Sequence, residues 1–181
     1  MHIALTGTPG TGKTTVASLL PYDVIDINTL VREGFSLGVD PERGCLEANM
    51  NGLEERLKEL DTESITILDG HFSHHFTAQA IVLRLHPKEL KKRLETRKYN
   101  EKKINENLEA EALDIVLAEA VEICKCVDEI DTTDKTPEEV ARLILGVIKG
   151  EIRLPPGGVN WLKDFLELNE LKIRSKSIFR A

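Results

Sequence analysis

The sequence is poor in cysteine. Its 181 residues include only Cys45, Cys124 and Cys126. Because their number is odd and no pair has CxxC spacing, the sequence predicts neither a disulfide framework nor a cysteine zinc site. We expect the three thiols to be ordinary core or near-surface groups.

Long apolar runs are also missing. The sequence has no run of ~20 apolar residues, the length that a membrane-spanning helix needs. Met1 leads directly into an expected strand, without an apolar stretch of signal-peptide length. These features predict a cytoplasmic chain with no membrane partner.

Positive net charge is the third absence, because the formal net charge is −7 at pH 7. Such a surface repels the phosphate backbone on average, which argues against sequence-independent binding of nucleic acid. Two basic zones nevertheless remain. Residues 88–103 contain eight Lys or Arg against three Glu, and the last residues include Lys172, Arg174, Lys176 and Arg180.

The length allows one α/β domain with a full core and a small appendage. Short apolar runs predict strands at residues 2–6, 23–27, 65–68, 80–85 and 127–130. Capping residues and helical spacing predict helices at 14–20, 29–34 (capped by Asn28), 47–60, 87–98, 105–125 and from Thr136 to near Gly150. Residues 35–44 are expected to form a loop, which is a plausible mobile flap.

Residues 7–15, GTPGTGKTT, match the Walker A phosphate-binding pattern. An expected strand precedes them and an expected helix follows, which is the order that a P-loop requires. The glycines let the backbone approach a ligand, so that successive N–H groups point at phosphate oxygens. The ATP-binding candidates are Gly10, Thr11, Gly12, Lys13, Thr14 and Thr15. Lys13 would reach the β and γ phosphates and the Thr14 hydroxyl would ligate Mg²⁺. The alternative is a glycine-rich turn with an accidental lysine.

Asp69 ends the apolar run 65–68, as a Walker B carboxylate does, and would orient the waters around Mg²⁺. The alternative is a turn residue before Gly70. His71 is a candidate for positioning water or a substrate oxygen near the γ-phosphate, or else a hydrogen-bonded loop histidine. We do not expect His74 and His75 to bind metal, because neighbouring side chains diverge in regular secondary structure.

Three arginines are candidates for binding phosphate. Arg93 and Arg97 lie four residues apart on an expected helix, so they share one face, where they would stabilise charge on the transferred phosphoryl group. Arg32 would bind the phosphate of a second substrate. Solvent-exposed helix charges are the alternative for all three.

Residues 154–158 combine two prolines and two glycines, which predicts a linker. Trp161, Leu162, Phe165 and Leu168 then have the spacing of the apolar face of one short helix. We expect this face to dock on the chain's own domain.

The P-loop, the LVRE segment at 30–33, the Asp69-x-His71 element and above all RLETRKYNEKK at 93–103 resemble the archaeal and nuclear adenylate-kinase-like NTPases. That group includes the coilin-interacting nuclear ATPase, and the likeness covers about residues 1–150. It implies a three-layer P-loop fold of the nucleoside monophosphate kinase type, with a five-stranded parallel sheet. It also implies adenylate kinase and ATPase activities, and a role in small ribosomal subunit maturation with a ribosomal protein and pre-ribosomal RNA as partners.

The resemblance further implies an AMP-binding segment at about 28–50 with Arg32, and a lid at about 96–106 with Arg97 contacting ATP. It places Lys135 against adenine and leaves residues 151–181 as an extension. This sequence departs from the family pattern at two positions. Lys98 stands where relatives usually have glycine, and Gly70 stands where they usually have a bulkier residue.

Three functions remain open from the sequence. The first is an adenylate kinase that uses ATP and AMP with Mg²⁺. The second is a nucleotide-gated ATPase that assembles ribosomes. The third is another small-molecule kinase on the same fold.

Overall fold

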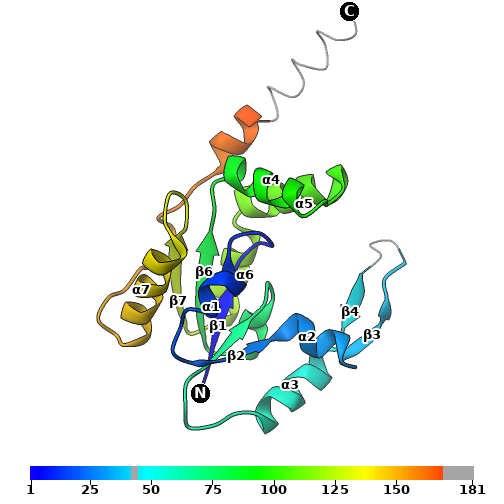
Figure 1. The fold of residues 1–181 in the computed structure, drawn as a ribbon, viewed down its shortest axis with the longest axis vertical. Coiled ribbons are helices and arrows are strands. Elements are labelled where there is room, and N and C mark those ends of the chain that lie inside the picture. The colour runs from blue at the N-terminus through cyan, green and yellow to red at the C-terminus, as the bar shows by residue number, and fades with distance from the viewer. Residues whose placement is uncertain (42–44, 169–181) are drawn as a thin grey trace, which may run out of the picture.

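The computed structural model describes residues 1–41 and 45–168 (Figure 1). At its centre is a five-stranded parallel sheet with the order β2-β5-β1-β6-β7. The strands are β1 (His2–Thr6), β2 (Asp23–Asp26), β5 (Thr66–Asp69), β6 (Gln79–Arg84) and β7 (Cys126–Asp131). Each lies on one of the expected apolar runs, so the predicted sheet is confirmed.

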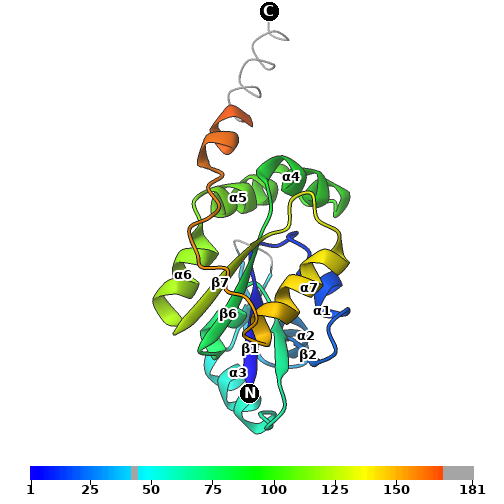
Figure 2. The same ribbon diagram turned by 90° about the vertical axis from the view of Figure 1, so that its left-hand side faces the viewer.

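Helices cover both faces of this sheet, which gives three layers (Figure 2). Alternate strand residues point to opposite faces. Ile3 and Leu5 therefore pack with α1 (Lys13–Ala17) and α7 (Pro137–Ile148). On the other face Ala4 packs with α6 (Ile115–Ile123), and Leu68 packs with α2 (Ile27–Arg32) and α3 (Met50–Glu59). The predicted three-layer α/β arrangement is confirmed.

Two further helices, α4 (Pro87–Thr96) and α5 (Glu101–Ala112), lie across the carboxyl ends of the strands (Figure 1). They share their own apolar cluster, formed by Leu85, Leu90, Leu94, Ile104 and Leu108. Parallel sheets place their ligands at this edge, so the α4–α5 pair stands beside the expected site.

The single helix expected at 105–125 is wrong. Asn100 caps α5 by accepting a hydrogen bond from the Lys103 amide, so this helix begins at Glu101. The chain breaks at Asp114, which has a left-handed φ of 56° before α6 begins. Asp tolerates this conformation better than most residues. The break brings the Asp114 carboxylate against Arg84, which gives it a structural role.

Four other expectations need correction. Asp26, not Asn28, caps α2, because its carboxylate accepts from the Asn28 and Thr29 amides. The expected loop at 35–44 contains β3 (Ser36–Val39), which pairs antiparallel with β4 (Leu46–Ala48). These strands are too short for a periodic signal. Because β4 occupies residues 46–48, α3 begins at Met50 rather than at residue 47. Separately, α1 ends at Ala17 rather than at residue 20.

The chain after α7 lies against the domain. The Glu129 amide of β7 donates to the Leu154 carbonyl at 2.7 Å, so residues 154–158 are not a free linker. Residues 162–168 are helical, Phe165 packs on the α4–α5 cluster, and Trp161 contacts the His86 ring at 4.9 Å. The basic residues from Lys172 onward lie outside the described residues. Within residues 1–41 and 45–168, no helix has the length and apolarity needed to span a membrane.

Lys98 occupies a position that favours glycine. Its φ is 57°, and the Lys98 and Tyr99 amides donate to the carbonyls of Glu95 and Leu94 after the end of α4. These two bonds define a Schellman motif, in which the left-handed residue is usually glycine. Lysine in place of glycine at position 98 therefore adds backbone strain as well as a positive charge.

We expect Lys98→Gly to raise the free energy of unfolding by about 1 kcal/mol, because the left-handed conformation is costly for any residue with a Cβ. Denaturant unfolding measures this change. The matched control is Glu95→Gly inside α4, which should lower stability by about 1 kcal/mol. A lower stability of Lys98→Gly would contradict the strained turn.

Candidate nucleotide-binding site

The P-loop connects β1 to α1 and is held between a strand and a helix. A Cβ on Gly7 would lie 2.3 Å from the Leu83 carbonyl oxygen of β6, and one on Gly10 would lie 2.7 Å from Leu90 of α4. Both glycines also have positive φ, at 133° and 105°. Glycine is therefore required at both positions, for space and for backbone conformation.

Lys13 is the buried cation of the loop. Its side-chain ammonium donates to the carbonyls of Gly7 at 2.7 Å and Thr8 at 3.1 Å. Burial lowers the pKa of Lys13 to about 8, and the charge of Arg97 adds to this effect, whereas Asp69 and Glu111 oppose it. Charged groups on three other segments of the chain therefore affect the pKa of Lys13.

Thr14 and Asp69 come together as the Walker interpretation expects. The Thr14 hydroxyl donates to the Asp69 carboxylate at 2.6 Å. Asp26 is the register partner of Asp69 on β2. Burial raises the pKa of Asp69, with a smaller contribution from Asp26 and opposition from Thr14 and Lys13. This group of oxygen donors fits Mg²⁺, which prefers oxygen ligands from carboxylates and hydroxyls.

The two arginines of α4 are placed differently. The Arg93 guanidinium donates to the Gly10 carbonyl at 3.3 Å and lies beside Gly12. Arg97 is exposed at the end of α4, and its charge acts on Lys13. Both cations are therefore on the P-loop side of α4.

His71 follows β5 at the carboxyl edge of the sheet. Its carbonyl accepts from the Thr6 hydroxyl at 3.1 Å, and its ring contacts Phe72 edge-on at 4.8 Å. Desolvation lowers the pKa of His71, and the charges of Lys13 and Lys103 lower it further. The imidazole is neutral at pH 7, as the sequence interpretation requires.

The departure at Gly70 has a steric reason. A Cβ on Gly70 would lie 3.1 Å from Cβ of Ile27, the first residue of α2. A bulkier residue would push α2 away from the end of β5. The close packing of α2 therefore fixes how the backbone presents His71.

Arg32 and Lys135 lie at the periphery of the site. The Arg32 guanidinium donates to the Thr29 hydroxyl at 2.7 Å and is 3.7 Å from the Asp26 carboxylate, with 61% of its side chain exposed. Lys135 is exposed in the loop after β7. That loop touches the P-loop through Thr132, whose hydroxyl is 3.3 Å from the Thr11 carbonyl.

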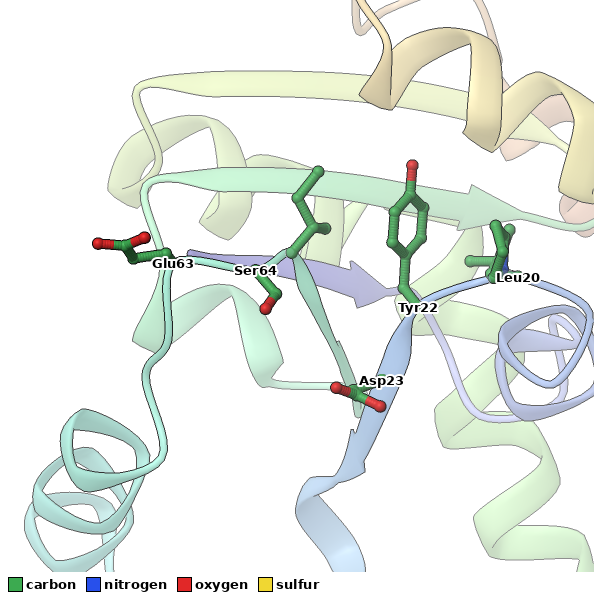
Figure 3. Close-up of a pocket in the computed structure, with 7 residues that line it drawn as sticks. Leu20, Tyr22, Asp23, Glu63 and Ser64 are labelled. Atoms are coloured by element: carbon green, nitrogen blue, oxygen red, sulfur yellow. The ribbon is translucent and has the colours of Figure 1, made fainter.

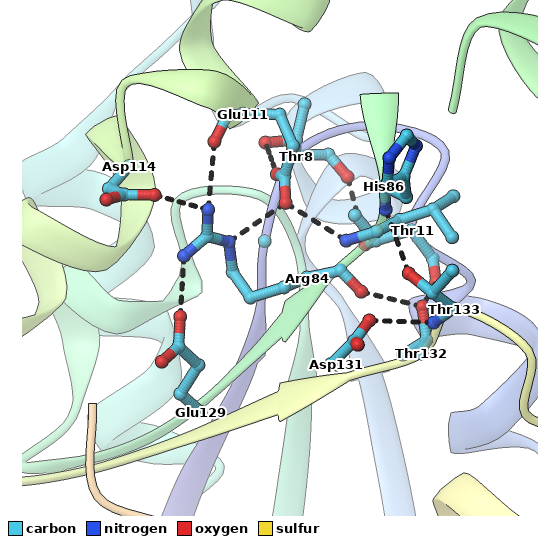
Figure 4. A network of polar contacts seen from close by, with 12 residues as sticks. Thr8, Thr11, Arg84, His86, Glu111, Asp114, Glu129, Asp131, Thr132 and Thr133 are labelled. Carbon is cyan, nitrogen blue, oxygen red and sulfur yellow. Dashed lines mark hydrogen bonds and ion pairs between the residues drawn. The ribbon is translucent and has the colours of Figure 1, made fainter. Parts of the chain in front are cut away.

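Sequence reasoning missed a buried polar network beside the P-loop (Figure 4). Glu111, from the buried face of α5, accepts from the Thr8 hydroxyl at 2.5 Å and from the Arg84 guanidinium at 2.9 Å. The Leu85 amide donates to the same carboxylate at 3.0 Å. A clue was present in the sequence, because Glu111 continues the helical stripe of Ile104 and Leu108.

Arg84 is the centre of this network. It is 1% exposed and binds Glu111, the Glu129 carboxylate at 2.6 Å, and Asp114. Burial acts to lower the pKa of Arg84, but the carboxylates of Glu111 and Asp114 outweigh it and raise the pKa above its usual value. An arginine within an apolar strand was the sequence signal for a buried ion network.

The hollow in Figure 3 is unrelated to this site. It has a volume of about 610 Å³ and lies at the amino ends of β2 and β5. Ligands of open parallel sheets bind beyond the opposite, carboxyl ends. Tyr22, Asp23 and Glu63 line the hollow.

Comparisons with known proteins agree with this arrangement. A family model described as an AAA domain matches residues 3–114. A protein of Methanothermobacter thermautotrophicus named "Putative adenylate kinase" is 47% identical over 88% of this chain and 96% of its own length. A protein of the same name from Pyrococcus abyssi is 40% identical over 93% of this chain and 95% of its own length.

Solved structures share the fold at low sequence identity. Shikimate kinase from Acinetobacter baumannii matches with a TM-score of 0.56 and 20% identity, over 83% of this chain and 93% of its own. Thymidylate kinase from Candida albicans matches with a TM-score of 0.54 and 15% identity, over 83% and 91%.

The lowered pKa of Lys13 predicts a pH-dependent stability. From about pH 8 up to its ordinary value of 10.5, the folded chain binds fewer protons at Lys13 than the unfolded chain. The free energy of unfolding therefore rises with pH across this window. Between these two pH values, we expect the free energy of unfolding of the wild type to rise by about 2–3 kcal/mol more than that of Lys13→Met. Nucleotide-free denaturant unfolding measures this gain.

Lys92→Met, which removes an exposed lysine of α4, is the control and should give no such difference. A constant difference between wild type and Lys13→Met would show that Lys13 is not buried as a cation.

Proposed function

The chain belongs to the archaeal adenylate-kinase-like family of P-loop kinases, and on that premise we propose that it transfers the γ-phosphoryl group of ATP to AMP. One observation carries the proposal, namely the convergence of Lys13, Arg93 and Arg97 on the P-loop. Phosphoryl transfer depends mainly on positioning and on neutralising charge spread over the phosphoryl oxygens. Lys13 on α1 and the two arginines at α4 supply both the positioning and the neutralising charge.

In this proposal the ATP phosphates lie on the backbone N–H groups from Gly10 to Thr15, with Lys13 at the β and γ phosphates. Arg97, in a lid of about residues 96–106, contacts ATP, and Lys135 lies against adenine. Thr14, and Asp69 through water, hold Mg²⁺, which supplies positive charge at the phosphate oxygens when bound. The exposed positions of Arg97 and Lys135 leave both free to meet a nucleotide.

The acceptor lies on the other side of the P-loop. We assign AMP binding to residues of about 28–50, which include most of α2 and the β3–β4 hairpin, with Arg32 at the phosphate. Its guanidinium is largely exposed and rests on Thr29 and Asp26. The AMP phosphate is already anionic at pH 7, so no strong base is needed to activate it.

A second function is favoured by charge and by His71. The eight basic residues of 88–103 belong largely to α4 and the start of α5, where an anionic ribosomal surface would be bound. We propose an accompanying ATPase activity and a role in small ribosomal subunit maturation, with a ribosomal protein and pre-ribosomal RNA as partners. This is the role implied by the resemblance to the coilin-interacting nuclear ATPase.

The proposed function is tested by measuring ADP formation with ATP alone, ATP plus AMP, and ATP plus thymidylate or shikimate. We expect AMP to give the fastest reaction. Arg32→Ala should raise the KM for AMP at least tenfold while the KM for ATP stays within about twofold, because Arg32 contacts only the acceptor.

Arg56→Ala is the matched control, since Arg56 is a partly exposed residue of α3 that pairs with Glu59 at 2.9 Å. Equal losses for ATP and AMP would remove Arg32 from the acceptor site. No acceleration by AMP over ATP alone would refute the adenylate kinase proposal.

His71 separates hydrolysis from transfer. If its neutral imidazole orients the attacking water, His71→Ala should lower ATP hydrolysis by ~10²-fold. Transfer to AMP should fall much less, because AMP brings its own nucleophilic oxygen. Single-turnover rates of both reactions test this, and equal losses would place His71 in a step that both reactions share.

A further inference from the structure

His74 carries an unsatisfied nitrogen in the interior of the protein. It belongs to the 3₁₀ turn η1 (Ser73–Phe76), which packs against β1 and α6, and it is 0% exposed. Within the described part of the chain, its Nε2 atom is buried and makes no hydrogen bond. Buried polar atoms are nearly always satisfied, so this nitrogen requires an explanation.

We assign the tautomer of the imidazole from the contacts of its other ring nitrogen. Nδ1 of His74 lies 3.1 Å from the Thr6 hydroxyl, and the same hydroxyl donates to the His71 carbonyl at 3.1 Å. A hydroxyl has one hydrogen, so when Thr6 donates to His71 it accepts from Nδ1–H. Nε2 then carries a lone pair.

That lone pair faces a carboxylate. Nε2 of His74 is 3.5 Å from Oε2 of Glu119 on α6. Two electron-rich atoms so placed repel each other unless a cation lies between them.

A third ligand stands beside the pair. The rings of His74 and His75 are 4.4 Å apart and tilted by only 35°. The expectation that these neighbours diverge is therefore wrong, because the η1 turn brings the rings together. Donor atoms of His74, His75 and Glu119 all lie within 4.8 Å of one another.

We propose that His74, His75 and Glu119 form a binding site for a divalent transition metal, with Zn²⁺ as the ion to test. Two imidazoles and one carboxylate suit Zn²⁺, which binds such ligands at about 2.0–2.2 Å. Small movements bring the donors to these distances, because Glu119 is half exposed and His75 is exposed. The Thr6 hydroxyl is the outer partner that fixes the His74 tautomer.

This site is independent of the proposed kinase chemistry but adjoins it. Thr6 is the last residue of β1, directly before Gly7 of the P-loop. A bound ion would fasten η1 to α6 and hold Thr6 in place. Its expected effect is therefore structural.

The test uses the untagged full chain without nucleotide, in a Cys45→Ser background that removes the exposed Cys45 thiol, because thiolates are competing zinc ligands. Titration calorimetry should show one Zn²⁺ per chain, and Zn²⁺ should raise the Tm where equal Mg²⁺ does not. Cobalt(II) should give visible bands without a thiolate charge-transfer band.

His75→Ala and Glu119→Gln should each weaken Zn²⁺ binding at least tenfold. Both replace exposed or half-exposed side chains, so the fold is expected to survive. Glu122→Gln, an exposed neighbour on the same helix, is the control and should bind like the parent. Substoichiometric binding, a loss in only one of the two variants, or a thiolate band would overturn the site.

Discussion

The rest of the structure depends on the buried guanidinium of Arg84. A buried charge is tolerated only when partners surround it, and removing one partner of such a group typically costs about 3–5 kcal/mol. Here the partners come from α5, the turn at Asp114 and β7. One cation therefore fixes where the helices beyond the sheet edge join the sheet.

The same network reaches the phosphate-binding loop. Glu111 uses one carboxylate oxygen for Arg84 and the other for the Thr8 hydroxyl. The loop is thus held from three sides, by β6 behind Gly7, by α4 above Gly10 and by α5 through Glu111. Because α5 continues from the segment proposed as the lid, any movement of α5 alters the bond to Thr8. Loop geometry and lid position are consequently coupled through one side chain.

The sequence sufficed to predict features that are encoded locally. The five strands and the capped start of α7 at Thr136 follow from apolar runs and capping residues. Short-range contacts decide these features, so short windows of sequence reveal them. The meeting of Thr14 with Asp69 was also predictable, because parallel strands end at one edge.

Features that depend on tertiary contacts were not predictable. The helix break at Asp114 is explained by an ion pair with Arg84, 30 positions away in the chain. The stacking of His74 on His75 arises from a turn without periodic pattern. Glu111 and Arg84 are charged residues within otherwise apolar stripes, and only the tertiary structure shows that they pair with each other.

The path of the chain beyond α7 has a consequence for solubility. β7 is an outer strand of the sheet, and outer strands expose unpaired backbone groups that can recruit strands of other molecules. Here the Glu129 amide is occupied by the Leu154 carbonyl, and the Glu129 carboxylate accepts from the Gly157 and Gly158 amides. Residues 154–158 thus cover part of the outer edge of β7 and protect it from pairing with a strand of another molecule. A chain cut at Gly150 would expose this edge and would be less soluble.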